Sequence, residues 1–98
     1  MVANSRFGFD LAQASPNPFS ENTSIRFSVP NRTHVSIEVY NILGQKVRTL
    51  VDETMEGNSY VRDWDGRGDT GARVSSGIYF YKMVAGDYSA TRKAVMLK

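Results

Sequence analysis

The feature that most constrains this sequence is an alternation of apolar and polar residues with a period of two. It is clearest at Ile25–Val29 and Val35–Val39, and residues that form turns separate the alternating segments. Successive side chains of a strand point to opposite faces, so each segment buries one face and exposes the other. No helical period persists over about ten residues. The sequence therefore predicts an all-β chain.

The turn signals divide the chain into about seven strands. This spacing is typical of an Ig-like antiparallel β-sandwich, with a small barrel as the alternative. We expect Ile25–Val29 and Val35–Val39 to form an antiparallel hairpin or its sandwich equivalent. Residues 1–6 are predicted to be a disordered or linker N-terminus, and residues 7–98 a single domain. The expected strands are residues 7–11, 24–29, 34–39, 45–51, 59–64, 77–85 and 88–97, with loops at 52–58 and 65–76.

The predicted core lies between the two sheets and takes the inward residues of the alternating strands. Residues 77–85 are apolar nearly throughout, so we expect a central strand covered on both faces. Alternation places Tyr79 and Tyr81 on one face of this strand. The expected core consists of Ile25, Phe27, Val29, Val35, Ile37, Val39, Trp64, Ile78 and Phe80.

Composition excludes several function classes. The chain has no cysteine, hence no disulfide, thiol nucleophile or thiolate metal site. Its 12 basic and 10 acidic residues are scattered, so no nucleic-acid partner is indicated. No apolar stretch of about 18 residues is present to span a membrane as a helix. No grouping of acid, base and nucleophile predicts an enzyme, a cofactor or a small-molecule substrate.

The loop after Trp64 carries three carboxylates, Asp63, Asp65 and Asp69. Calcium takes several oxygen ligands from such loops, but Arg67 stands where a further ligand belongs. We therefore expect an ordinary turn and no metal. The Arg67–Asp69 tripeptide matches a cell-adhesion motif, which three residues match easily by chance. His34 falls on the polar phase of its strand and is expected to be solvent-exposed.

Four segments in order carry a resemblance to known families. They are Ser15-Pro16-Asn17-Pro18-Phe19, then Val39–Arg48 (VYNILGQKVR), Trp64-Asp65-Gly66 with Gly71, and Ser76–Tyr81 (SGIYFY) running on to Lys93 and Lys98. This order resembles the type A C-terminal sorting domains of the type IX secretion system. It also resembles the Ig-like domain of the flagellar hook-capping protein.

The sorting resemblance implies a domain that directs a covalently fused upstream cargo across the periplasm and outer membrane. The implied partners are an outer-membrane translocon and a sortase-like protease, and the implied location is secreted or at the cell surface. The implied recognition residues are Pro16, Asn17, Pro18, Gly77, Tyr79, Arg92, Lys93, Val95, Leu97 and Lys98.

Two other functions remain open at this stage. One is a structural assembly domain of hook-capping type. The other is a carbohydrate-binding module that uses the aromatic residues Trp64, Tyr79, Phe80, Tyr81 and Tyr88. For the sorting function, we expect the terminal strand to lie at a sheet edge and to pair with a partner strand. Deletion of residues 96–98 is then expected to cost the fold little.

Overall fold

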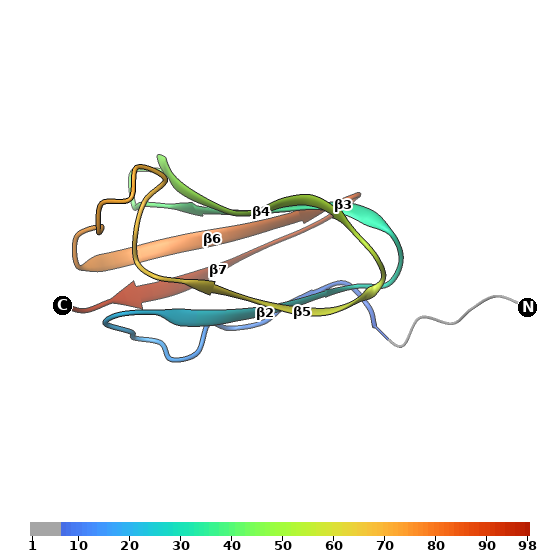
Figure 1. Ribbon diagram of the computed structural model, residues 1–98, viewed down its shortest axis with the longest axis horizontal. Coiled ribbons are helices and arrows are strands. Elements are labelled where there is room, and N and C mark those ends of the chain that lie inside the picture. Colours follow the sequence, from blue (N-terminus) through green and yellow to red (C-terminus); the bar gives the residue numbers. More distant parts are fainter. Residues whose placement is uncertain (1–6) are drawn as a thin grey trace, which may run out of the picture.

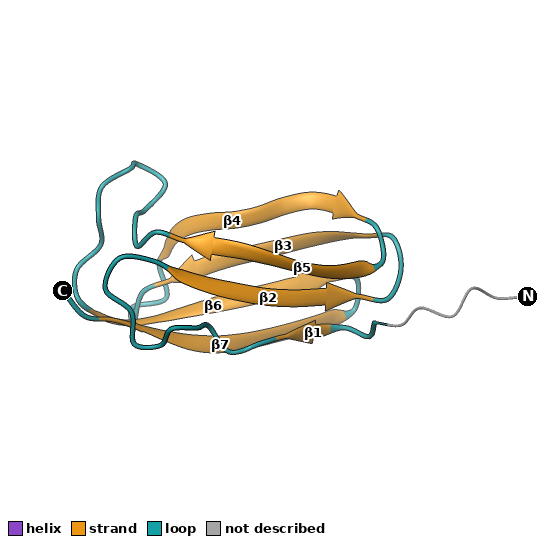
Figure 2. Ribbon diagram, turned by 60° about the horizontal axis from the view of Figure 1, so that its bottom comes forward, coloured by secondary structure: helices purple, strands orange, loops and turns teal. Residues whose placement is uncertain are grey.

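The computed structural model describes residues 7–98 as a two-layer β-sandwich without helices (Figures 1 and 2). A three-stranded sheet has the order β1-β2-β5, and a four-stranded sheet has the order β4-β3-β6-β7. Every strand pair within the two sheets is antiparallel. The strands are β1 (Asp10–Leu11), β2 (Thr23–Val29), β3 (Thr33–Tyr40), β4 (Lys46–Met55), β5 (Asn58–Trp64), β6 (Gly77–Ala85) and β7 (Tyr88–Met96).

The two segments with the clearest alternation lie in different sheets. β2 pairs with β1 and β5, whereas β3 pairs with β4 and β6. The connection through Pro30 carries the chain from one layer to the other. The two segments therefore form the sandwich equivalent of a hairpin and do not pair with each other as an antiparallel hairpin. The all-β, Ig-like fold with seven strands is confirmed.

Two strands differ from the sequence-based expectation by more than one residue at an end. β4 continues to Met55, through residues expected to form a loop. Polar residues at 52–54 are compatible with a strand here because β4 is a sheet edge, exposed on one side. β1 has only two residues, Asp10 and Leu11, instead of five. The proposed N-terminal linker, residues 1–6, lies outside the described residues.

The core contains most of the predicted side chains, but the predicted orientation of β6 is wrong. Tyr79 and Tyr81 are buried, while Ile78 and Phe80 are 42% and 37% exposed. β6 is central within its sheet, yet the sandwich has two layers and covers only one face of that sheet. An apolar run on both faces therefore does not imply burial on both. The confirmed core residues are Ile25, Phe27, Val29, Val35, Ile37, Val39 and Trp64.

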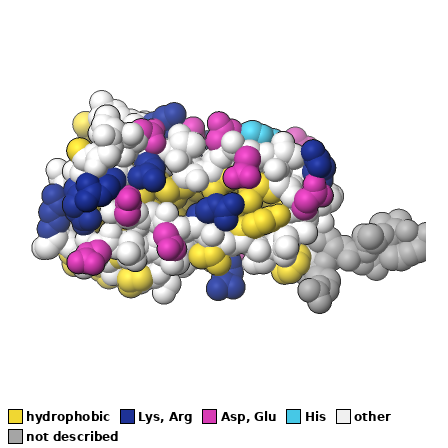
Figure 3. All heavy atoms as spheres, viewed as in Figure 1, with side chains coloured by type: hydrophobic (Ala, Val, Ile, Leu, Met, Phe, Trp, Pro, Cys, Tyr) yellow, Lys and Arg dark blue, Asp and Glu magenta, His cyan; other side chains and the backbone are white. Residues whose placement is uncertain are grey.

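The two long sides of the sandwich are closed differently. On one side, residues 11–19 run beside β7 and link the two sheets. On the other side, β4 and β5 face each other as free edges, with Arg62 and Glu53 forming an ion pair of 3.8 Å across the seam. Hydrophobic side chains are visible along this seam (Figure 3).

The first described residues and the C-terminus lie at opposite ends of the long axis (Figure 1). The loop of residues 65–76 and the turn of residues 41–44 lie at the same end as the C-terminus, which we call the C-terminal end. None of the elements in residues 7–98 is a helix that could cross a membrane.

Candidate functional site

The Pro16–Pro18 segment and the terminal strand, far apart in the sequence, form one unit at the C-terminal end. The side chain of Asn17 bonds to two backbone groups of β7: its Oδ1 accepts from the Val95 amide at 2.8 Å, and its Nδ2 donates to the Lys93 carbonyl at 3.0 Å. The peptide bonds before Pro16 and Pro18 are cis. Asn17 thus substitutes for a neighbouring strand.

Phe19 continues this pairing through its backbone. Its amide donates to the Val95 carbonyl at 2.9 Å, and its carbonyl accepts from the Leu97 amide at 2.8 Å. Gln13 adds a bond from its Nε2 to the Lys93 carbonyl at 2.8 Å. From the Lys93 carbonyl to the Leu97 amide, the outward backbone groups of β7 are therefore occupied within the domain.

This occupancy corrects two expectations about the terminal strand. β7 is a sheet edge, as predicted. However, a partner strand finds no free backbone groups between Lys93 and Leu97. The end of the chain is not frayed either, because Met96 is fully buried and lies against Gly66. Deletion of residues 96–98 removes part of the core.

Tyr79 connects the Gly77-x-Tyr79 segment to Phe19, the residue after Pro18, through a chain of aromatic contacts. Its ring meets Trp64 edge-on at 5.4 Å, and Trp64 in turn contacts Phe19 at 5.4 Å. The Tyr79 hydroxyl donates to the Ser75 carbonyl at 2.6 Å. Burial raises the pKa of Tyr79 above its usual value. The role of Tyr79 in the structure is thus to pack the C-terminal end.

The predicted basic residues occupy different environments. Arg92 donates from Nε to the Leu11 carbonyl at 2.5 Å, which ties β7 to β1. Lys93 and Lys98 have exposed side chains at the C-terminal end, and the Lys98 amide donates to the Ser76 hydroxyl at 3.0 Å. Lys93, Val95, Leu97 and Lys98 therefore lie with the Pro16–Pro18 segment, whereas Arg92 lies nearer the middle of the strand.

Protein groups engage all three carboxylates of the expected turn. Asp63 accepts from the Ser24 hydroxyl at 2.6 Å, and Asp65 accepts from the Arg67 amide at 3.0 Å. Asp69 accepts from the Thr49 amide at 3.1 Å, and its own amide donates to the Val47 carbonyl at 2.8 Å. Within residues 7–98 no three acidic or histidine residues gather as a metal site would require.

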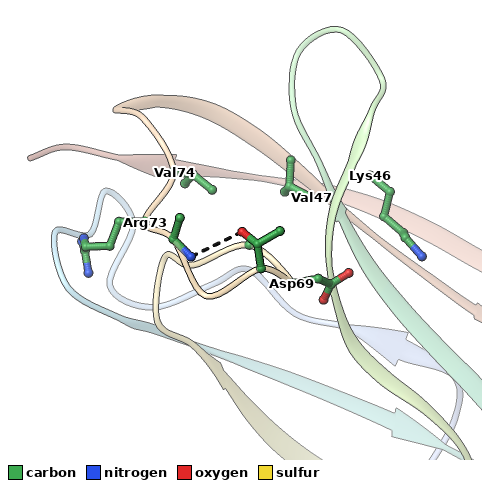
Figure 4. Close-up of a pocket in the computed structure, with 8 residues that line it drawn as sticks. Lys46, Val47, Asp69, Arg73 and Val74 are labelled. Atoms are coloured by element: carbon green, nitrogen blue, oxygen red, sulfur yellow. Dashed lines mark hydrogen bonds between the residues drawn. The ribbon is translucent and has the colours of Figure 1, made fainter.

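A hollow of about 370 Å³ lies between this loop and β4 (Figure 4). Val47 and Val74 form its apolar part, with Lys46, Asp69 and Arg73 around it. The Arg73 guanidinium donates to the Ser20 and Asp65 carbonyls at 2.5 and 3.2 Å. The Arg73 guanidinium therefore holds the loop in place.

Burial removes most of the aromatic platform of the carbohydrate-binding alternative and leaves only Phe80 exposed. Trp64, Tyr79 and Tyr81 are buried in the core, so their ring faces are not available to a sugar. Tyr88 is half-buried and stacks on Phe9 at 5.1 Å. His34 is exposed, as predicted, and bonds Asp52 through Nε2 at 2.8 Å.

Sequence reasoning missed three parts of this site. Phe19 was part of the motif, but its pairing with β7 was not foreseen, and neither was the contact of Gln13. The turn of Asn41–Gly44, which lies between two expected strands, exposes Ile42 and Leu43 at this end. The available signal was two consecutive large apolar residues at a turn tip.

Comparison with known proteins identifies the family of this site. The family model of the secretion system C-terminal sorting domain matches residues 14–97. The chain therefore belongs to the family of secretion system C-terminal sorting domains. This match favours the sorting resemblance over the hook-capping one. No curated protein matches the chain.

Solved structures share the fold. Dimeric latent PorU from Porphyromonas gingivalis aligns with a TM-score of 0.74 and 18% identity, over 99% of this chain and 10% of that one. PorZ, a surface component of the type IX secretion system of the same organism, aligns with a TM-score of 0.59 and 17% identity, over 88% of this chain and 11% of that one. The chain thus spans about a tenth of each of these proteins.

Proposed function

We propose that this domain directs an upstream cargo protein through a type IX secretion system to the cell surface. The observation that carries the proposal is the joining of Pro16–Pro18 to residues 93–97, because two parts of the sorting motif become one surface. The family match and the fold shared with PorU and PorZ support it. The cargo joins at the end opposite to this surface.

The mode of recognition follows from the occupied strand edge. Since the outward backbone groups from the Lys93 carbonyl to the Leu97 amide are occupied, we expect the secretion machinery to read exposed side chains here rather than to add a strand. Lys93, Leu97 and Lys98 are exposed and suited to this role. Pro16 and Pro18 are exposed beside them, whereas Gly77, Tyr79 and Arg92 act by shaping the surface. An outer-membrane translocon and a sortase-like protease are the partners of this proposal.

The test is a reporter fused upstream of residues 1–98 in a host with a type IX secretion system. We expect the fusion to reach the cell surface, while the reporter alone remains in the periplasm. A Leu97→Ser, Lys98→Ala variant keeps the backbone bonds and should reach the surface less efficiently. A matched control is Val61→Ser, which changes a 45% exposed residue on the other sheet. Retention of the intact fusion in the periplasm of a proven host contradicts the proposal.

A further inference from the structure

The turn of Asn41–Gly44 is held rigidly by its own polar groups. The Asn41 Oδ1 accepts from the Leu43 and Gln45 amides at 2.9 and 3.1 Å, and its Nδ2 donates to the Gln45 side chain at 2.9 Å. The Gly44 amide donates to the Asn41 carbonyl at 3.0 Å. Gly44 has a φ of 81°, which a side chain would disfavour. The turn is therefore a fixed shape rather than an adaptable loop.

This rigid turn presents two apolar side chains to solvent. Ile42 and Leu43 are 70% and 77% exposed. Single exposed apolar residues are common, but a contiguous exposed apolar patch marks an interaction surface. A fixed backbone also lowers the entropy lost when these side chains bind.

The turn is continuous with the apolar outer face of the four-stranded sheet. Tyr40 pairs with Phe80 in the last pair of the β3–β6 register, and the turn begins at the next residue. A hollow of about 270 Å³ has both Ile42 and Ile78 in its wall, together with Ser75–Gly77. Its size suits one large side chain of a partner.

The charges around this surface are positive. Lys93 lies opposite Phe80 in the register of β6 and β7, and Lys98 follows the end of β7, where its amide donates to the Ser76 hydroxyl. Neither forms an ion pair within residues 7–98. The acidic neighbour Glu38 is bonded to the Tyr40 hydroxyl at 2.6 Å and lies 3.7 Å from Lys46.

These features select an acidic protein segment as the occupant. A second copy packed on the same face brings Lys93 and Lys98 toward like charges, which disfavours association. An anionic membrane matches the cations but leaves the hollow beside Ile42 and Ile78 unfilled. An acidic segment with one large apolar residue satisfies both the hollow and the cations.

We infer that Ile42, Leu43, Ile78 and Phe80, bordered by Lys93 and Lys98, form a docking surface for an acidic, apolar-anchored segment of the secretion machinery. This inference rests on the proposed function and names the surface through which it operates. The surface is formed mainly by residues outside the predicted recognition set.

The first experiment measures surface display of the reporter fusion. We expect Ile42→Ser, Leu43→Ser to lower display by about tenfold, as removal of apolar anchors does in other interfaces. The matched control is Val84→Ser, at the other end of the same face of β6 and 39% exposed. Thermal melts of the isolated domain must show that both variants remain folded. Wild-type display by the double variant overturns the inference.

The second experiment identifies the occupant. A photoreactive residue replaces Leu43 in the fusion, and the crosslinked peptide is sequenced. We expect a peptide richer in Asp and Glu than in Lys and Arg, from an outer-membrane component of the secretion system. Lys93→Glu, Lys98→Glu should abolish the crosslink, while Arg26→Glu, on the other sheet, should preserve it. A crosslink to lipid, to a second copy, to a basic peptide or to nothing overturns the inference.

The two proposals fail in different ways. If the intact fusion is displayed and the Ile42→Ser, Leu43→Ser fusion is displayed equally well, only the docking surface is wrong. If the intact fusion is retained in the periplasm, the sorting function is wrong and the docking surface falls with it.

Discussion

The side chain of Asn17 covers the outer edge of β7 at Val95, where its Oδ1 accepts a hydrogen bond from the Val95 amide at 2.8 Å. Its second bond, to the Lys93 carbonyl, makes the same side chain both acceptor and donor to one strand. A strand neighbour supplies the same pair of bonds in a sheet. Thus one amide side chain protects an edge that is otherwise open to another chain.

Asn17→Ala should therefore destabilise the domain. The Val95 amide is left without a partner in a half-buried position, and such a loss costs about 1–3 kcal/mol. Urea unfolding monitored by Trp64 fluorescence measures the change. Asn22→Ala is the control, because Asn22 is exposed and its side chain makes no hydrogen bond within the described chain. Equal stability of the two variants shows that the bonds of Asn17 are not needed.

Removal of residues 96–98 should cost much more than removal of Lys98 alone. The longer deletion takes away the buried Met96, and loss of such a side chain costs about 2–5 kcal/mol. It also breaks the bond from the Leu97 amide to the Phe19 carbonyl. Deletion of Lys98 loses one exposed bond to Ser76. Thermal melts should separate the two truncations, and coincident melts contradict this account.

A side chain at Gly77 should strain the backbone. Gly77 has a φ of 152°, which residues with a side chain rarely adopt, while the space around its Cβ position is open. Gly77→Ala should thus lose about 1–3 kcal/mol from strain alone. Gly8→Ala is a matched control, since its Cβ also meets nothing and its φ is ordinary. Chemical denaturation of both variants tests the difference, and a neutral Gly77→Ala contradicts it.

Alternation in the sequence correctly predicted the strands that have one solvent-exposed face. In β2 and β3, polar residues identify the outward phase, so their core residues are correct. In β6 the outward phase is apolar except for Lys82, which is the one local sign that this phase faces solvent. The pairing of Tyr81 with the inward residue Val39 gives the same orientation. That pairing joins residues far apart in the sequence, which a local pattern does not reveal.

The candidate site was predictable only in its components. The motif order indicated Pro16–Pro18 and the terminal strand. The bonds of Asn17, however, join it to residues that follow it by 76 and 78 positions in the sequence. The exposure of Ile42 also depends on the tertiary fold, since an apolar turn residue is just as able to fold back onto a core.

Calcium should leave the stability of the domain unchanged. Asp63 accepts from the Ser24 hydroxyl, whereas Asp65 and Asp69 lie 3.2 and 3.9 Å from the Arg48 guanidinium, which already supplies a positive charge between them. A ligand stabilises a fold only if it binds the native state more tightly than the unfolded state. Melts in millimolar calcium and in chelator should therefore coincide. An increase of several degrees in calcium contradicts this prediction.

Strongly alkaline pH should destabilise the domain through its buried tyrosines, chiefly Tyr81. Burial raises the pKa of Tyr81, although the Ala14 amide and Arg92 lower it in part. The folded state therefore holds the phenol proton more tightly than the unfolded chain, whose tyrosines ionise near pH 10. The stabilisation is complete below about pH 10 and is lost as pH rises through the folded pKa.

Tyr81→Phe separates this effect from the titration of lysines. The Tyr81 hydroxyl donates to the Ala12 carbonyl at 2.7 Å and accepts from the Ala14 amide at 2.8 Å. Its removal should cost about 1–3 kcal/mol near neutral pH, because both backbone groups lose a buried partner. Above about pH 10, however, the variant has no phenol to ionise at this position, so its free energy of unfolding should decline less steeply than that of the wild type. Urea unfolding at a series of pH values from neutral to strongly alkaline measures both slopes. Parallel curves for the two proteins show that Tyr81 is not the group whose ionisation opens the core.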